Sequence, residues 1–187
     1  MVGLNNQHGV GLIEVMVALL LLAVAVLGFS ALQMNALNAT DESLIRSRAM
    51  NVSKQLSENM RVNNLATNDF TLELNKLNQG ATNITEYCAK VTQANSSFNK
   101  DTCKAAACTS KQIAALNTLQ AAKLACEQDI MLNMTGCPEM SGINARQCII
   151  TSWGSTLPVL DGSNKNACGN NDGSYKIGSH CLVMESY

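Results

Sequence analysis

The chain has 187 residues, a formal net charge of −1 from 13 Lys and Arg against 14 Asp and Glu, and only seven aromatic residues (three Phe, three Tyr and one Trp). This length fits one domain with an appendage. The balanced charge argues against a nucleic-acid binder that depends on a basic surface, and the few aromatic residues argue against a base-stacking platform. All eight cysteines lie between Cys88 and Cys181, which indicates an oxidising compartment.

An uncharged apolar segment follows Glu14 near the N-terminus. No charged residue occurs between Glu14 and Asp41, and residues 15–32 are apolar apart from one glycine and one serine. As a helix, residues 10–32 would span roughly 34 Å, enough for a bilayer core of about 30 Å. The segment is apolar on every side, so it is not the amphipathic core helix of a soluble domain. It must lie in lipid, be removed, or pack all round against other protein.

Two general interpretations of this segment compete with a third that rests on a motif. A removable signal peptide has a possible cleavage site at residues 23–25 (AVA), but no Lys or Arg precedes the apolar run. A plain single-span anchor would place Arg46, Arg48 and Lys54 in the cytoplasm by the positive-inside rule. All eight cysteines lie on that same side, and disulfides do not persist in a reducing cytosol. We give the cysteines more weight and expect this side to face an oxidising compartment.

The third interpretation starts from residues 9–14, with the sequence GVGLIE directly before the apolar run. This motif resembles the type IV prepilin signature, in which a peptidase cuts a short leader after Gly and Glu is the fifth residue of the mature chain. The resemblance implies cleavage between Gly9 and Val10, N-methylation of Val10, and Glu14 at the fifth position. Two features depart from the family pattern: Val10 replaces the usual Phe, and the leader, residues 1–9, lacks basic residues.

Glu14 has a physical argument of its own. A carboxylate in a membrane helix is costly to bury, by about 2.5–3.5 kcal/mol, so a partner is expected. The alternative is that Glu14 is an ordinary interface residue whose carboxylate reaches the lipid headgroups. The prepilin resemblance implies the partner: cleavage creates an α-amine at Val10, and Glu14 would neutralise such an amine in a growing fibre. Because an unpaired carboxylate is heavily penalised in low dielectric, this pairing would select the subunit register.

Beyond Asp41 the pattern becomes amphipathic. Apolar residues recur at spacings of three and four, which is typical of one helix face, and no Pro or Gly interrupts residues 29–77. We therefore predict one long helix over residues 10–63, apolar in its first half and amphipathic in its second. The predicted packing stripe consists of Ile45, Ala49, Val52, Leu56 and Met60.

The second half of this helix resembles PilV-type minor pilins, which are named for type IV pilus modification. The resemblance rests on residues 31–33 (ALQ), 46–49 (RSRA) and 59–63 (NMRVN). It implies an α+β fold in which the long helix packs on a small disulfide-rich head with an antiparallel sheet. The chain would then divide into a leader (1–9), a transmembrane or filament-core helix (10–40), and the amphipathic continuation with its head (41–187).

The head gives weaker local signals. Residues 63–99 are polar and Asn-rich, which is typical of a loop with short elements. A capping box at Thr109 and Gln112 predicts an extra helix over 109–135, with one side formed by Ile113, Leu116, Gln120 and Leu124. Strands are expected at residues 147–151 and 175–184, the second broken by Gly178, and an exposed loop is expected at 161–174.

The cysteines predict up to four disulfides, whose pairing the spacing does not decide. The resemblance to pilins, many of which close a C-terminal loop with a cystine, favours Cys168 with Cys181. Zinc is the rival interpretation, but no C-x-x-C occurs and only His180 remains after cleavage at Gly9, so we expect no metal and no cofactor. The disulfide candidates are Cys88, Cys103, Cys108, Cys126, Cys137, Cys148, Cys168 and Cys181.

No catalytic motif is present in the sequence, and a Cys–His pair would have to use His180 beside Cys181. We therefore expect a structural protein and no enzyme.

The resemblance implies a minor pilin that acts in pilus assembly or at the tip. Its partners would be other major and minor pilins, the prepilin peptidase and the inner-membrane assembly platform. It would lie in the bacterial inner membrane with a periplasmic head, and later in a cell-surface pilus. The alternatives are a type II secretion pseudopilin and a membrane-anchored disulfide-rich adhesin or binding module.

Overall fold

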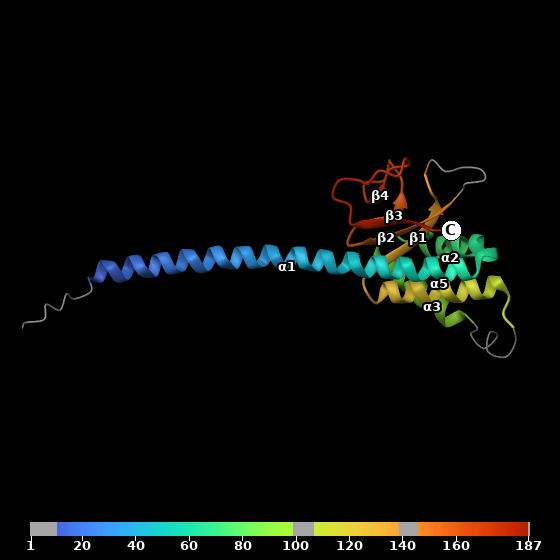
Figure 1. Ribbon diagram of the computed structural model, residues 1–187, viewed down its shortest axis with the longest axis horizontal. Coiled ribbons are helices and arrows are strands. Elements are labelled where there is room, and N and C mark those ends of the chain that lie inside the picture. Colours follow the sequence, from blue (N-terminus) through green and yellow to red (C-terminus); the bar gives the residue numbers. More distant parts are fainter. Residues whose placement is uncertain (1–10, 99–106, 139–145, 187) are drawn as a thin grey trace, which may run out of the picture. The chain divides into compact units, whose positions relative to one another are not determined.

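A computed structural model describes residues 11–98, 107–138 and 146–186. The chain divides into two compact units, Met1–Ser43 and Leu44–Tyr187. The first contains only the beginning of the long helix α1 among its described residues, and the second contains the rest of α1 and every other element (Figure 1). The two units are described separately below.

Helix α1 spans Leu12–Val62, in agreement with the predicted long helix, although Val10 lies outside the described residues. Its first half exposes its apolar side chains, and burial begins only at Ala49. The predicted packing stripe is confirmed, with Ile45 partly buried and one further buried residue, Ser53, in addition. The buried residues recur every three or four positions because one helix face alone meets the head. They are Ala49, Val52, Ser53, Leu56 and Met60.

The expectation of a loop with short elements is wrong for residues 63–98, and residue 99 lies outside the described residues. A 3₁₀ turn, η1 (Asn64–Ala66), leads into helix α2 (Thr67–Asn78), and helix α3 follows at Ile84–Ser97. Asn83 caps α3, since its side chain accepts a hydrogen bond of 2.9 Å from the Glu86 N–H. Helix α2 buries only three residues, at spacings of four and three, and this narrow apolar face is hidden in a polar sequence. These residues are Phe70, Leu74 and Leu77.

The extra head helix, α5, spans Ser110–Cys126, and its capping box is present as predicted. Thr109 accepts from the Gln112 N–H at 3.3 Å, and Gln112 Oε1 accepts from the Thr109 N–H at 3.0 Å. The predicted extent to residue 135 is wrong, because the chain turns at Asp129, which has a φ of 56°. Of the four residues expected on one side of this helix, Leu124 packs against the core, whereas Ile113 and Gln120 are exposed. The buried face of α5 consists mainly of alanines, which let neighbouring elements approach closely. Its buried residues are Ala114, Thr118, Leu119, Ala121, Ala122 and Ala125.

An antiparallel three-stranded sheet forms the centre of the head, in the order β1-β2-β5. Strand β1 spans Ile130–Gly136, which includes residues 130–135 that were expected to be the end of the extra helix. Strand β2 spans Gln147–Trp153 and confirms the strand expected at 147–151. Strand β5 spans only Cys181–Ser186. The strand expected at 175–184 therefore begins late, because a turn with Gly178 at a φ of 77° precedes it.

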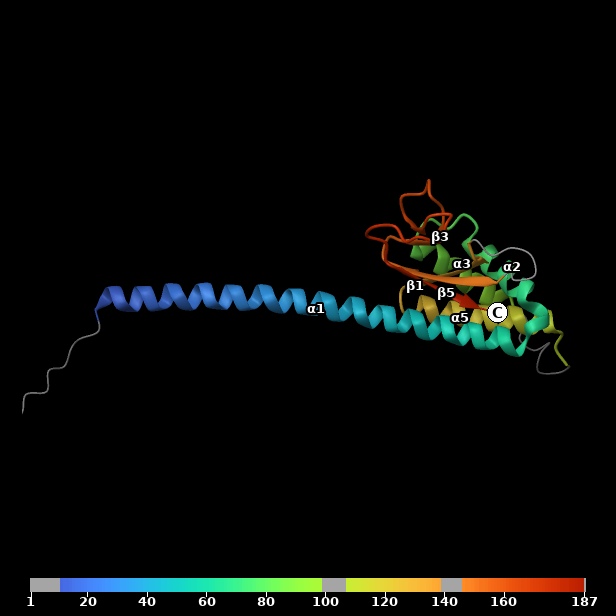
Figure 2. The same cartoon turned by 45° about the horizontal axis from the view of Figure 1, so that its top comes forward.

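The two faces of the sheet pack against different layers. Leu182 and Met184 pack against the larger core, which includes the buried stripe of α1, whereas Ile150 and Cys181 form part of a second, smaller core. That core lies between the sheet and a parallel pair of strands, β3 (Leu157–Leu160) and β4 (Ala167–Gly169). The helices and the β3–β4 pair consequently lie on opposite sides of the sheet (Figures 1 and 2).

The β3–β4 pair corrects one further expectation. Residues 161–174 are not an exposed loop throughout, because all three residues of β4 are buried. The protein is thus α+β, with a long N-terminal helix and a small head that contains an antiparallel sheet, additional helices and three described disulfides.

Candidate functional site

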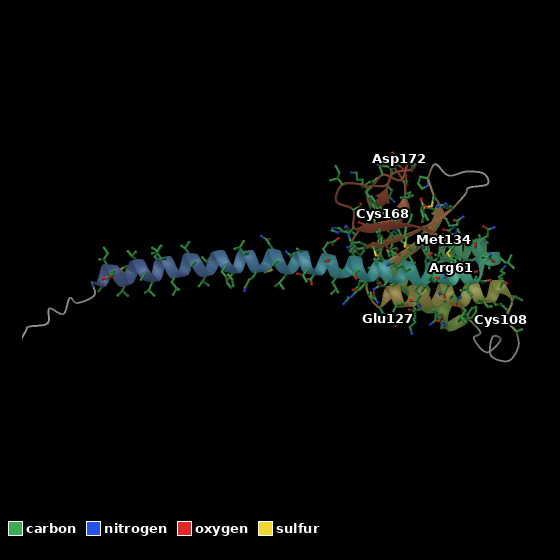
Figure 3. All side chains as sticks on the ribbon, in the orientation of Figure 1. Arg61, Cys108, Glu127, Met134, Cys168 and Asp172 are labelled. Carbon is green, nitrogen blue, oxygen red and sulfur yellow. A yellow bond between two sulfur atoms is a disulfide. The ribbon has the colours of Figure 1, made fainter. Side chains whose placement is uncertain are left out.

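Glu14 lies in the first turn of α1, with its N–H donating to the Gly11 carbonyl at 2.9 Å. Gly9 and Val10, the expected cleavage and methylation positions, lie outside the described residues. The side chain of Glu14 is exposed, as are those that follow it through Thr40. Figure 3 shows these side chains projecting all round the first part of the helix. The Glu14 carboxylate therefore lies at the start of a long, uncharged, apolar helical segment.

Among the described residues, α1 alone is long and apolar enough to cross a membrane, a judgement that rests on length and composition. Its hydroxyl groups suit such an environment. Ser30 Oγ donates to the Val26 carbonyl and Thr40 Oγ1 to the Ala36 carbonyl, each at 2.9 Å. Hydrocarbon offers no hydrogen-bond partners, so polar groups of a spanning helix must be satisfied within the helix or by a neighbouring protein. The Glu14 carboxylate has no such internal partner among the described residues.

Three disulfides join elements of the head. Cys88–Cys126 links α3 to α5 across 38 residues, Cys137–Cys148 closes the β1–β2 hairpin, and Cys168–Cys181 links β4 to β5. Cys168–Cys181 is the pair favoured by the resemblance described above. Cys108 is also disulfide-bonded, and Cys103 lies outside the described residues. These bonds stabilise a head with a divided core mainly by restricting its unfolded chain.

The only cysteine–histidine neighbours, Cys181 and His180, have no catalytic geometry. Cys181 is bonded to Cys168, so it offers no thiolate, and the His180 ring lies 6.4 Å from the Trp153 ring. Within the described ranges no three His, Cys, Asp or Glu side chains gather into a group that could hold a metal ion.

The C-terminal loop carries charges whose role the sequence did not reveal. The Lys176 ammonium donates to the Gly162 carbonyl at 3.1 Å and to the Asn164 carbonyl, which closes the loop on its own backbone. Asp161 Oδ1 accepts from the Ser163 hydroxyl at 2.7 Å and from its N–H at 2.9 Å. These bonds, with a smaller effect of Lys176, lower the pKa of the Asp161 carboxyl. A lysine ten or more residues away cannot be recognised as a clamp from sequence spacing.

Comparison with known families covers most of the α1–α5 region. Residues 4–30 match the model described as the prokaryotic N-terminal methylation motif, and residues 31–119 match that described as type IV pilin Tt1218. The first match contains the GVGLIE motif and Glu14, and the second runs from the apolar half of α1 into α5. No curated protein and no solved structure matches the chain.

Proposed function

Since the chain is a type IV prepilin-like protein, we propose that it acts as a PilV-type minor pilin, a subunit that assembles with other pilins at the start or tip of a type IV pilus. The observation that carries this proposal is Glu14 in the first turn of a helix whose next 26 residues, 15–40, are uncharged and exposed. Such a helix needs an apolar environment, and its carboxylate needs a cationic partner.

Processing is the first step of the proposal. The prepilin peptidase removes the leader, residues 1–9, by hydrolysing the peptide bond between Gly9 and Val10, and the new amine of Val10 is methylated. The match to the N-terminal methylation motif over residues 4–30 supports this step. In the fibre, Glu14 faces the cationic N-terminus of a neighbouring subunit. In a low-dielectric core this pairing favours one register of packing over the others, since a shifted register leaves the carboxylate unpaired.

The proposed location follows from the same segment. Residues 10–40 hold the protein in the inner membrane as a single span until the assembly platform extracts it, and residues 41–187 face the periplasm. The three described disulfides support this orientation, because such bonds persist in an oxidising compartment. The role is structural, in keeping with the pilin family, and the protein needs no enzymatic activity or cofactor.

The N-terminus of the mature chain tests processing. Intact mass and peptide sequencing are compared between cells that contain the prepilin peptidase and cells that lack it. We expect a chain that begins at N-methylated Val10 only where the peptidase is present. A chain that begins at Met1 in both strains, or near residue 26, contradicts the proposal.

Assembly is tested by Glu14→Gln, which keeps the side-chain shape and removes the charge. We expect a membrane level equal to that of the wild type and at least a ten-fold lower amount in sheared pili. Asp41→Asn is the matched control, because it neutralises an exposed carboxylate on the same helix. If the Glu14→Gln variant enters pili in the same amount as the wild type, the proposed pairing is wrong.

Deletion of the gene tests which machine the protein belongs to. If the deletion stops exoprotein secretion and leaves piliation intact, the protein is a type II secretion pseudopilin instead.

A further inference from the structure

A pocket of about 310 Å³ lies between Arg46 of α1 and residues of the C-terminal loop and β5. Two of its lining side chains are cationic, two carry hydroxyl groups, and none is acidic. A pocket of this composition favours an anion with several acceptor oxygens, such as a phosphate group, because both cations can donate to it. The lining residues are Arg46, Tyr175, Lys176, Ser179, Cys181 and Leu182.

Three of these side chains keep a donor for such a ligand. Arg46 is exposed, and its guanidinium has no ion pair or hydrogen bond among the described residues. Lys176 donates to two backbone carbonyls, so one of its three ammonium protons remains. The Tyr175 hydroxyl accepts from the Val183 N–H at 2.9 Å, and the proton of this hydroxyl stays available for a ligand.

The neighbouring carboxylates do not occupy the pocket. The Asp161 carboxylate is bonded to Ser163, which is the main cause of its lowered pKa, and Lys176 adds only a smaller effect. Asp161 does not line the pocket, and neither do Asp41 and Glu42, the acidic residues nearest to Arg46 along α1. The pocket therefore has positive charge without an acidic side chain in its lining.

A turn beside the pocket presents an apolar side chain to the outside. The Ser179 N–H donates to the Lys176 carbonyl at 3.1 Å, and Gly178 has a φ of 77° at the third position of this four-residue turn, as in a type II turn. Ile177, at the second position, is completely exposed. A single exposed isoleucine is ordinary on a protein surface, but an exposed isoleucine next to a cationic pocket is typical of surfaces that meet lipid.

The turn is held in place by the rest of the head. The disulfide between Cys168 and Cys181 joins the two ends of the segment that contains it, and Cys168 is labelled in Figure 3. The Lys176 N–H donates to the Cys168 carbonyl at 3.1 Å. The exposed position of Ile177 is therefore fixed before any ligand binds, which lowers the entropy cost of binding.

The place of Arg46 in the sequence indicates the source of the anion. Arg46 comes six residues after Thr40, the last residue of the uncharged, exposed segment of α1. When a helix spans a bilayer, long cationic side chains close to the end of the span reach the headgroup layer, where anionic lipids attract them. Tyrosine is also enriched at this level, since its ring is apolar and its hydroxyl is polar. These properties favour a lipid phosphate.

We propose that the pocket and the turn form a docking site for the headgroup of an anionic phospholipid in the membrane that holds α1. Arg46 and Lys176 bind the phosphate oxygens, the Tyr175 hydroxyl donates to one of them, and Ile177 enters the boundary between headgroups and acyl chains. The bound lipid holds the head on the membrane surface. This inference rests on the membrane location proposed above and does not depend on the minor-pilin role.

The test uses the full chain, labelled with ¹⁵N, in nanodiscs of phosphatidylcholine to which phosphatidylglycerol is added stepwise. We expect the NMR signals of the Arg46 side chain and of the Lys176 and Ile177 amides to shift and to saturate as phosphatidylglycerol increases. The absence of such shifts overturns the proposal. So do equal shifts with inorganic phosphate in pure phosphatidylcholine discs, which would assign the pocket to a soluble anion, or with a hexaglutamate peptide, which would assign it to an acidic protein segment.

Retention of the chain in the discs separates this inference from the proposed function. A wild-type chain that does not stay in discs of either composition contradicts the proposed membrane location, and the docking site with it. A chain that stays in the discs without responding to phosphatidylglycerol contradicts the docking site alone.

Two matched pairs of variants locate the site. Arg46 and Arg48 are both exposed on α1, but only Arg46 lines the pocket. Arg46→Gln should raise the phosphatidylglycerol fraction at half saturation about five-fold, and Arg48→Gln less than about two-fold. Ile177 and Leu65 are both almost fully exposed, and Leu65 lies on η1, away from the pocket lining. Ile177→Ser should raise that fraction at least about three-fold, whereas Leu65→Ser should leave it unchanged. Equal effects within either pair overturn the proposal.

Discussion

Asp161 and Asp172 occupy equivalent positions in two Asp-Gly-Ser turns of the C-terminal loop. In each turn the carboxylate accepts from the serine two residues later, at 2.7 Å from its hydroxyl and 2.9 Å from its N–H. These hydrogen bonds, first the side-chain and then the backbone one, lower the pKa of both carboxyls from the ordinary value of 3.8. The two turns are therefore held by charged acceptors at neutral pH.

The lowered pKa values predict how the loop responds to acid. A carboxyl whose pKa is lower in the folded loop stabilises that loop above its ordinary pKa, and the contribution is lost as pH falls from 3.8 through the folded value. We expect the amide proton shifts of Ser163 and Ser174 to titrate with midpoints below 3.8. In Asp161→Asn the amide oxygen still accepts, so the shift of Ser163 should no longer titrate in this range. Midpoints at or above 3.8 would contradict the assignment of these bonds.

At the scale of elements, helix starts are encoded locally and helix ends are not. The capping box at Thr109 is a four-residue signal, and it marks the first turn of α5. The end of α5 depends on Asp129, whose left-handed φ of 56° is uncommon for a residue other than Gly. Four of the five residues that follow, Ile130 through Met134, are apolar and suit either a helix or a strand. Pairing with β2 across the sheet makes them a strand.

Thr109→Ala tests the cap of α5. Loss of the Thr109 hydroxyl leaves the Gln112 N–H without its acceptor and should destabilise the first turn by about 1 kcal/mol. The expected readout is faster hydrogen exchange at Gln112 and Ile113. Thr92→Ala in α3 is the control, because that hydroxyl donates within the helix, to the Cys88 carbonyl, and its removal costs little. Unchanged exchange in Thr109→Ala would show that packing alone holds this turn.

For the whole molecule, the disulfide Cys168–Cys181 connects the sheet to the β3–β4 pair, whereas the other two described disulfides lie within the helical layer and within the sheet. The smaller core of Ile150, Cys168 and Cys181 lies between the sheet and the β3–β4 pair, and one disulfide passes through it. The larger core joins α1, α2, α3, α5 and the other face of the sheet. Removing the bond in the smaller core should therefore loosen the β3–β4 side and leave the helical side folded.

Replacing Cys168 and Cys181 together by Ser tests this division. Loss of the bond should lower the free energy of unfolding by about 2–4 kcal/mol and expose the C-terminal loop. Trypsin should then cut faster after Lys165 and Lys176, while helical circular dichroism stays near the wild-type value. Equal cutting rates with and without the bond would mean that the smaller core and the Lys176 clamp suffice.

The long helix, its charge-free apolar half, the buried stripe of α1 and the cap at Thr109 were determined by the sequence itself. Each depends on residues within one or two turns of a helix, so the period of the apolar residues and the absence of charge reveal it. The tertiary structure alone decided that α2 and α3 form, that 130–136 is a strand, and which cysteines pair. These features depend on partners tens of residues away, and the stabilisation that selects them comes from packing and strand pairing that local patterns do not contain.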